Sequence, residues 1–421
     1  MKVLWVCHTV LNDFSDEFGI PKKPFSGWIE TLWRSLKKRT GLQVSFAFPI
    51  FDEFRMKNGE CEDSRYYSFH ANMNNRKYDP SMMQEFVDIL RKEKPDIIHI
   101  WGTEFNHTRA MIDAAHKLKL HNRVVIRMQG LVSRYATDYA KGVPCDYITM
   151  KNEETKQSIQ DDINEYIVRG NEEVYSLKRV SYIVGRGDWD CFYARQLNPT
   201  VKCYSLDNIL RPAFYRKENQ WNYEECQQRS IFVAQAHYPM KGLHILLKAV
   251  AMIRNRYPDI KIYVGGVSPF SYAHRTGYTK LLDDQIKKYN LNDNVCFLGT
   301  LTPQEMVSSY RKANIFVCPS LLDNRANCIM EALMLGVPTI ASFVGGDIGA
   351  YTHGMDGFYY PAEDEWMLSG YIDKVFSDPQ VAIDLSNNAK RDARKNFDSP
   401  ECTVNKTITM YRDIMQHNKY E

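Results

Sequence analysis

Short apolar runs alternate along most of the chain with stretches in which apolar residues recur every three or four positions. The stretches with this three- to four-residue spacing lie at 27–39, 81–93 and 107–119, and the spacing predicts amphipathic helices. The apolar runs end in glycine or polar residues, which favours short buried strands. Strands that alternate with helices are typical of parallel sheets with crossover helices, so the pattern predicts an α/β fold.

The predicted strands fall into two series, separated by the polar residues 208–229, which include Pro212. The first series lies at 2–8, 43–49, 96–102, 123–130, 180–187 and 201–207, and the second at 230–236, 259–266, 294–300, 314–320, 337–342 and 357–361. We therefore predict two Rossmann-like domains, residues 1–210 and 211–399, with a ligand cleft at the carboxyl ends of their strands. Residues 400–421 have apolar positions at helical spacing and are predicted to form a helix that packs back on the first domain.

Composition narrows the class of protein. The 421 residues include 54 basic and 51 acidic side chains, and a net charge of +3 gives no reason to expect a nucleic-acid partner. The ten cysteines show no C-x-x-C spacing, which favours free thiols in a reducing compartment. The first residues lack the pattern of a secretory signal, and no run approaches the ~18 apolar residues of a membrane span. We predict a cytoplasmic protein.

The stretch "LLDNRANCIMEALMLGVP" (321–338) carries two carboxylates, Asp323 and Glu331, eight positions apart. It follows a predicted strand, and we predict a helix with Asn327 as its N-cap and Gly336 after its last turn. The helix dipole alone favours an acid near a helix N-terminus. Alternatively, the loop amides bind a diphosphate while the two acids accept hydrogen bonds from sugar hydroxyls.

Two further segments favour the second interpretation. "YPMKGLHILLKA" places Lys241 and Gly242 between a predicted strand and a helix, where a cation and exposed amides can meet a phosphate. "SFVGGDIGAY" places two glycines directly after a strand, which allows a close backbone approach or a tight turn. Each segment is a weak signal by itself, and their order and spacing together are more specific.

In these segments, together with "VCFLGTLTPQEMVSSYRKANIFVCPS", the chain resembles glycosyltransferase family 4 over residues 230 to about 365, and more loosely in the first half. The resemblance implies the GT-B fold and transfer of a sugar, with retention, from a nucleotide sugar to a hydroxyl acceptor. It also implies that neither a metal nor a cofactor is needed. UDP or GDP would be the nucleotide, and the acceptor would be a glycan or lipid-linked oligosaccharide of a bacterial surface polysaccharide.

The resemblance also assigns roles to residues. Glu331 would hold the ribose hydroxyls, Asp323 would contact the transferred sugar, and Lys241 would neutralise charge on the leaving group. Further donor contacts would come from the following residues: Gly27, Gln235, Gly242, Arg325, Ala326, Asn327 and Cys328. Asp323 stands where the family more often has Glu, and this shorter side chain bears on sugar preference.

Two positions depart from the family pattern. The family usually has Arg where this chain has Gln235, and His where it has Gln129. A missing cation removes a charge-assisted contact to the leaving group. Our hypothesis is that another cation replaces it, with Arg325 the first candidate and Arg211 the second.

In the first half, "KKPFSGWIE" (22–30) corresponds to a glycine-containing loop of the family. Gly27 matches the glycine and Ser26 takes the place of a second one, although a loop glycine before a helix needs no ligand. Thr103 and Glu104 follow the strand at 96–102 and are candidates for the acceptor side, together with Gln129. His99, in the same strand, is equally consistent with a core histidine.

The pair Asp188 and Asp190 has the D-x-D spacing of metal-dependent glycosyltransferases of another fold, but Asp188 as a helix N-cap is the better interpretation. We predict no metal. The helix at 27–39 is basic and amphipathic, which fits either a domain core with a solvated basic face or an anionic membrane surface. Two other functions stay open: a nucleotide-sugar epimerase that needs no acceptor, and a nucleotide-sugar-binding protein without catalysis.

Overall fold

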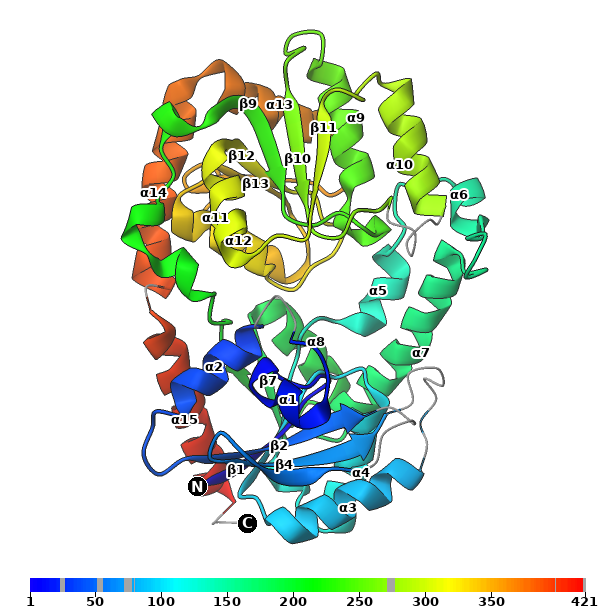
Figure 1. Cartoon of the computed structure of the whole chain (residues 1–421), viewed down its shortest axis with the longest axis vertical. Coiled ribbons are helices and arrows are strands. Elements are labelled where there is room, and N and C mark those ends of the chain that lie inside the picture. The colour runs from blue at the N-terminus through cyan, green and yellow to red at the C-terminus, as the bar shows by residue number, and fades with distance from the viewer. Residues whose placement is uncertain are drawn as a thin grey trace. The chain divides into compact units, whose positions relative to one another are not determined.

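The computed structural model describes residues 1–22, 27–50, 56–71, 78, 80–270, 277–397 and 399–418 (Figure 1). The chain divides into two compact units. Unit 1 comprises Met1–Tyr135, Glu165–Ile209 and Ser399–Glu421, and unit 2 comprises Ala136–Asn164 and Leu210–Asp398. Each unit is a Rossmann-like α/β domain built on a mainly parallel sheet.

Unit 1 contains an eight-stranded sheet with the order β3-β4-β2-β1-β5-β6-β7-β8. Its strands are β1 (Lys2–Val6), β2 (Gln43–Ile50), β3 (Asn58–Cys61), β4 (Ser64–His70), β5 (Ile97–Trp101), β6 (Val124–Arg127), β7 (Tyr182–Gly185) and β8 (Lys202–Ser205). All six strands predicted for this half overlap an observed strand. The β3–β4 hairpin, the one antiparallel pair in the sheet among the described residues, was not predicted.

The helices of unit 1 cover both faces of this sheet. They are α1 (Ser15–Phe18), α2 (Trp28–Leu36), α3 (Ser81–Glu93), α4 (Asn106–Lys117), α8 (Asp188–Leu197) and α15 (Pro400–His417), with parts of α5 (Val132–Asp138) and α7 (Ile159–Leu177). Side chains alternate across a strand, so Leu4 and Val6 join a core cluster with residues of α3 and α4, which lie side by side (Figure 1). Trp5 points to the other face, where its ring contacts Phe46 and Trp101.

The C-terminal helix α15 belongs to unit 1. Trp5 Nε1 donates to the Tyr411 hydroxyl at 3.1 Å, and this hydroxyl lies 2.6 Å from His99 Nδ1. His99 is 1% exposed, and burial holds its pKa well below the ordinary value, so it is a neutral core histidine. The described part of the predicted helix ends at Asn418, and residues 419–421 lie outside the described residues.

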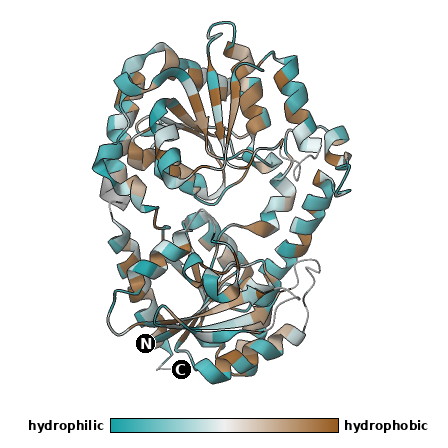
Figure 2. Cartoon of the chain, viewed as in Figure 1, coloured by the Kyte–Doolittle hydropathy of each residue, from teal (hydrophilic) through white to brown (hydrophobic). Residues whose placement is uncertain are grey.

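Unit 2 contains a parallel six-stranded sheet with the order β11-β10-β9-β12-β13-β14. Its strands are β9 (Gln227–Val233), β10 (Lys261–Gly265), β11 (Val295–Gly299), β12 (Ala313–Cys318), β13 (Thr339–Ser342) and β14 (Gly357–Tyr360). Its helices are α6 (Cys145–Thr149), α9 (Leu243–Ile253), α10 (Gly277–Lys288), α11 (Pro303–Lys312), α12 (Asn327–Leu335), α13 (Glu365–Ser377) and α14 (Pro379–Phe397). Hydrophobic residues line the strands of this sheet (Figure 2), as their buried apolar runs predict.

Residues 136–164 correct the predicted domain boundaries, because they belong to unit 2 although the strand pattern assigned 1–210 to one domain. The reason is local packing. The Tyr147 hydroxyl donates to Asp284 Oδ2 at 2.9 Å, and the Lys141 carbonyl lies 2.9 Å from His244 Nε2. A Cβ on Gly277 would lie 1.8 Å from the Tyr147 carbonyl oxygen, so α6 sits directly against the start of α10.

Among the described residues, no helix combines the length and the apolar character that crossing a bilayer requires.

Candidate functional site

The β12–α12 loop (residues 319–326) connects a fully buried strand to a mostly buried helix in unit 2. The helix begins at Asn327, and Ala326 is the residue that precedes it, so the predicted N-cap role of Asn327 is wrong by one position. The register shifts because the Ala326 backbone is still outside the helical region, whereas Asn327 is already helical. Gly336 ends the helix in the left-handed conformation with φ 75°, as predicted.

Lys241 and Asp323, which are far apart in the sequence, form an ion pair. Lys241 ends the short 3-10 helix η6 (Pro239–Lys241), and its Nζ donates to Asp323 Oδ2 at 2.7 Å. Ser320 Oγ donates to the same oxygen at 3.3 Å. Burial opposes the charge on Lys241, but Asp323, Tyr238 and Cys328 together outweigh it and hold the pKa of the ammonium well above its ordinary value. The structure therefore places a permanent cation against the β12–α12 loop.

Gly242 is required where it stands. Its φ is +70°, and an added Cβ would lie 1.8 Å from the Pro319 carbonyl oxygen. No L residue with a side chain fits there without moving the backbone of the β12–α12 loop. The glycine therefore allows Lys241 to approach Asp323.

Glu331 lies on α12 and forms a second ion pair. Arg211 Nη2 donates to its Oε1 at 2.7 Å, and the Tyr310 hydroxyl donates to its Oε2 at 3.3 Å. The Glu331 side chain is 7% exposed, and burial raises the pKa of its carboxyl group in spite of the Arg211 charge. Arg211, the second candidate to replace the missing cation at position 235, is thus bound to Glu331.

The other predicted donor residues of unit 2 lie in this loop, in the first turn of α12, or after β9. Arg325 has φ 56°, a left-handed conformation that is uncommon without glycine. The amide of Ala326 already donates to Asp347 Oδ1 at 2.6 Å, and Cys328 Sγ lies 4.0 Å from Cys318 Sγ. Gln235 is exposed, with its Nε2 3.3 Å from His237 Nδ1.

Asp347 was missed by the sequence reasoning. It ends the turn η8 (Gly345–Asp347). The two glycines before it were the feature in the sequence that could have drawn attention to it, but they indicated only a tight turn or a close backbone approach. The turn lies against the β12–α12 loop, because the Gly346 amide donates to the Asp323 carbonyl at 3.0 Å. A Cβ on Gly346 would lie 2.3 Å from Asn324 Oδ1, so the glycine serves close approach.

In unit 1, Thr103 and Glu104 lie at the carboxyl end of β5 and both are buried. Glu104 accepts hydrogen bonds from Arg169 Nη2 and from the Thr103 amide, each at 3.0 Å. The Thr103 hydroxyl donates to Glu173, which also accepts from the Ser133 amide at 2.9 Å and the Ser133 hydroxyl at 2.7 Å. Burial raises the pKa of Glu173 to about 7. The sequence reasoning missed Glu173 because it lies inside a polar helical stretch.

Gln129, which follows β6, lies beside a histidine that the sequence reasoning did not consider. Its Nε2 is 3.3 Å from His8 Nδ1, and the His8 ring stacks on Phe105 with 5.3 Å between centroids. His8 follows β1, which is adjacent to β5 in the sheet. An imidazole therefore lies next to the position at which the chain has glutamine instead of the family's histidine.

Gly27 precedes α2 with φ −70°, and an added Cβ would meet none of the described residues within 4 Å. Neither this backbone conformation nor packing against the described residues requires glycine there. Ser26, its predicted companion, lies outside the described residues.

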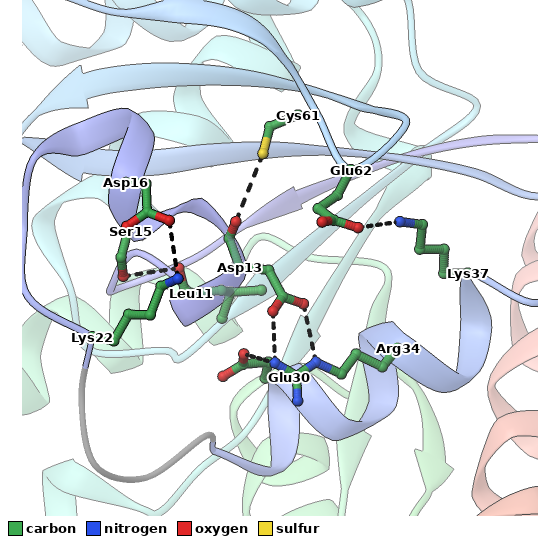
Figure 3. A network of polar contacts seen from close by, with 10 residues as sticks. All are labelled: Leu11, Asp13, Ser15, Asp16, Lys22, Glu30, Arg34, Lys37, Cys61 and Glu62. Atoms are coloured by element: carbon green, nitrogen blue, oxygen red, sulfur yellow. Dashed lines mark hydrogen bonds and ion pairs between the residues drawn. The ribbon is translucent and has the colours of Figure 1, made fainter.

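Helix α2 uses its apolar face inside unit 1, where its buried residues include Ile29, Leu32 and Leu36. Arg34 in its last turn and Lys37 directly after it are paired (Figure 3). Arg34 donates to Asp13 at 2.6 Å and to Glu30 at 2.7 Å, and Lys37 pairs with Glu62. Of the two interpretations of this basic amphipathic helix, the structure supports the domain core, because the apolar face is not available to a membrane.

Asp188 is the first residue of α8 and Gly187 precedes the helix, so the predicted N-cap role of Asp188 is wrong by one position. Asp190 accepts from the amides of Arg186, Gly187 and Cys191, at 2.7, 3.2 and 2.9 Å. Both of its carboxylate oxygens therefore bind the turn before the helix. Within the described residues, no group of three or more His, Cys, Asp or Glu side chains is arranged to hold a metal ion.

Residues 216–392 match the model of the family described as Glycosyl transferases group 1. A curated relative, the D-inositol 3-phosphate glycosyltransferase of Corynebacterium urealyticum, is 28% identical over 178 residues, which is 42% of this chain and 41% of that protein. The chain thus matches less than half the length of this relative. The residues that match the family model include η6, the β12–α12 loop and α12.

Two solved structures resemble the whole chain. Sucrose-phosphate synthase from Thermosynechococcus elongatus has a TM-score of 0.68 and 17% identity, covering 99% of this chain and 100% of that one. Anabaena HepE in complex with UDP has a TM-score of 0.64 and 16% identity, covering 98% and 100%. These similarities show that the fold is that of the GT-B glycosyltransferases.

Proposed function

We propose that this chain, which belongs to the Glycosyl transferases group 1 family over residues 216–392, is a retaining glycosyltransferase that needs no metal. It would move a sugar from a nucleoside diphosphate sugar to a hydroxyl group of an acceptor. The observation that carries the proposal is the Lys241–Asp323 ion pair beside the start of α12.

This ion pair suits a ligand that carries both phosphate and sugar. A diphosphate would take the Lys241 ammonium, which the loop now holds against Asp323, and backbone amides near the start of α12 would add to the attraction. The Asp323 carboxylate would then be released to accept a hydrogen bond from a sugar hydroxyl. Glu331, positioned by Arg211 and Tyr310, would accept hydrogen bonds from the ribose.

The proposed reaction is a front-face substitution. The acceptor oxygen forms a bond to the anomeric carbon while the bond from that carbon to the diphosphate oxygen breaks, and the acceptor proton moves to the leaving diphosphate. Lys241 would stabilise the charge that develops on this leaving group. Thr103, Glu104 and Gln129 remain the proposed groups on the acceptor side, and His8 joins them because it lies 3.3 Å from Gln129.

UDP or GDP is the proposed nucleotide, and the structural resemblance to HepE, which was solved with UDP, supports UDP. The proposed acceptor is a glycan or a lipid-linked oligosaccharide of a bacterial surface polysaccharide such as capsule, exopolysaccharide or lipopolysaccharide. The reaction would take place in the cytoplasm, at the inner face of the membrane. The family resemblance alone supports this setting.

The test is thermal unfolding of the wild type with UDP, GDP, ADP and CMP. A nucleotide at ~100 times its dissociation constant should stabilise the protein by ~2.7 kcal/mol. Lys241→Met should abolish this stabilisation, whereas Lys287→Met, which removes an exposed lysine of α10, should leave it intact. No stabilisation of the wild type by any of the four would overturn the proposal.

A nucleotide that stabilises the wild type then selects the sugar donors for turnover assays. Release of nucleoside diphosphate only when an acceptor is present supports transfer. An epimerised donor formed without acceptor would identify an epimerase instead, and binding with no reaction would identify a non-catalytic protein.

A further inference from the structure

We propose that Asp347 is a positioning residue of the β12–α12 loop and that it acts as a neutral acid which fastens the amide of Ala326. The inference deepens the proposed function and rests on it, because this loop carries Asp323 and leads into α12. Asp347 is not assigned a contact with a ligand, since it is only 1% exposed and its Oδ1 accepts from the Ala326 amide.

Backbone and side-chain bonds join the η8 turn to the β12–α12 loop. Ala326 N donates to Asp347 Oδ1 at 2.6 Å, and Gly346 N donates to the Asp323 carbonyl at 3.0 Å. The Ser342 hydroxyl donates to the Ser320 carbonyl. The loop backbone is therefore held at Ser320 by β13 and at Asp323 by the η8 turn. Among the described residues, Asp347 is the one whose side chain accepts from the residue that precedes α12.

The η8 turn is itself braced from β14. The Tyr359 hydroxyl donates to the Asp347 carbonyl oxygen at 2.6 Å, and the amide of Ala350 donates to the same oxygen at 3.1 Å. The Asp347 backbone is thus fixed independently of its carboxyl group. Shortening the side chain should release Ala326 without dissolving the turn.

The second carboxyl oxygen indicates the protonation state. Asp347 Oδ2 is buried and has no hydrogen-bond partner among the described residues, whereas a buried ionised oxygen would need one. Burial and the nearby Asp323 charge hold the pKa of Asp347 well above its ordinary value. The titratable groups around it, on the elements packed against the turn, are Lys241, Cys318, Asp323, Tyr351 and Tyr359.

A neutral Asp347 has a direct consequence for the Lys241–Asp323 pair. With its proton, Asp347 accepts from Ala326 and leaves Asp323 as the carboxylate that faces Lys241. Without its proton, a second buried anion would repel Asp323 and compete for Lys241. The position of the loop should therefore depend on pH through Asp347.

Two variants separate these states. Asp347→Asn keeps the shape and the acceptor oxygen without a charge, and it represents the protonated acid. Asp347→Ala leaves the buried Ala326 amide without a partner. Dissociation constants for UDP, or for whichever of GDP, ADP and CMP the wild type binds, are measured between pH 6 and pH 9.5, with the melting temperature as the control for folding.

At pH 6.5 we expect Asp347→Asn to bind the nucleotide within about twofold of the wild type, and Asp347→Ala to bind it about tenfold more weakly, because an unpaired buried amide is left. As the pH rises, binding by the wild type should weaken relative to binding by Asp347→Asn, since the nucleotide and Lys241 titrate in the same way in both proteins. Equal binding by Asp347→Ala and the wild type would overturn the positioning role. Binding by Asp347→Asn that is as weak as that of Asp347→Ala, with no relative change with pH, would overturn the neutral acid.

Hydrogen exchange of residues 320–328 without nucleotide tests the inference separately from the proposed function. Faster exchange in Asp347→Ala than in Asp347→Asn is expected even for a protein that binds none of the four nucleotides. Equal exchange in both variants would overturn the positioning role. If Asp347→Ala does not fold, Asp347→Ser, whose hydroxyl is shorter in reach, replaces it in both measurements.

Discussion

In unit 2, two ion pairs hold the candidate site, and they join segments that are 82 and 120 residues apart: Lys241 with Asp323, and Arg211 with Glu331. In unit 1, one ion pair, Arg169 with Glu104, lies beside a second buried acid, Glu173, which accepts hydrogen bonds from Thr103 and Ser133. Both arrangements lie at the carboxyl ends of parallel strands. A charged ligand can replace one partner of an ion pair. By contrast, Glu173 accepts hydrogen bonds from hydroxyl groups and an amide, and these bonds fix the loops around it.

The two glycines named as donor contacts differ in the same way. Gly242 has no room for a Cβ, because the Pro319 carbonyl oxygen would lie 1.8 Å away. Gly27 has an ordinary φ, and none of the described residues lies within 4 Å of an added Cβ. The fold explains why residue 242 is a glycine, so a substitution of Gly242 tests the structure. The fold does not explain why residue 27 is a glycine, so a substitution of Gly27 tests whether a ligand contacts it.

The largest expected effect is that of Glu331→Ala. The change leaves the Arg211 guanidinium, whose side chain is 18% exposed, without its partner, and we expect about 3 kcal/mol of destabilisation in urea unfolding. Asp283→Ala removes one partner of an exposed ion pair of α10 and should change stability by less than ~0.5 kcal/mol. Equal effects of the two variants would mean that the buried pair is no stronger than a surface pair.

Glu173→Gln should change the pH dependence of stability. The pKa of Glu173 is raised from its ordinary 4.5 to about 7, so the folded state binds a proton that the unfolded state has released between these values. The stabilisation is therefore full below pH 4.5 and is lost as the pH rises through 7. Relative to Glu173→Gln, the wild type should lose roughly 3 kcal/mol between pH 4 and pH 8. A constant difference across this range would show that the pKa of Glu173 is the same in the folded and unfolded states.

Gly242→Ala should destabilise the protein by roughly 2 kcal/mol, because the methyl group meets backbone and φ is +70°. Urea unfolding measures the effect. Nucleotide stabilisation should fall as well, since Lys241 can no longer approach Asp323 through an undistorted loop. Unchanged stability would contradict the close approach to Pro319.

Gly27→Ala should have the smallest effect on folding, less than ~0.5 kcal/mol, since no described residue lies within 4 Å of the added methyl group. Nucleotide binding then distinguishes this variant from Gly242→Ala. If the Gly27 backbone contacts the phosphates, as the family resemblance implies, Gly27→Ala should weaken nucleotide binding with no change in stability. If binding is also unchanged, Gly27 is only the residue that precedes α2.

Periodicity in the sequence was enough to predict most elements, because buried strands and amphipathic helices leave local patterns. All twelve predicted apolar runs overlap a strand of the structure. The hairpin of β3 and β4 was not predicted, because β3 is the polar segment "NGEC" and has no apolar run. Its turn also lacks a glycine, although Glu62 and Asp63 have positive φ. Helix starts at Asn327 and Asp188 were each misplaced by one residue.

The sequence by itself determined two α/β units and the segment that carries Lys241, Asp323 and Glu331, because strand and helix periods and a local motif are properties of neighbouring residues. Only the tertiary structure decided that Arg211 pairs with Glu331, that Asp347 holds Ala326, and that residues 136–164 join unit 2. Each of these depends on which distant segments pack together. Burial and hydrogen bonds between distant segments produce no periodic pattern among neighbouring residues, so the sequence does not predict them.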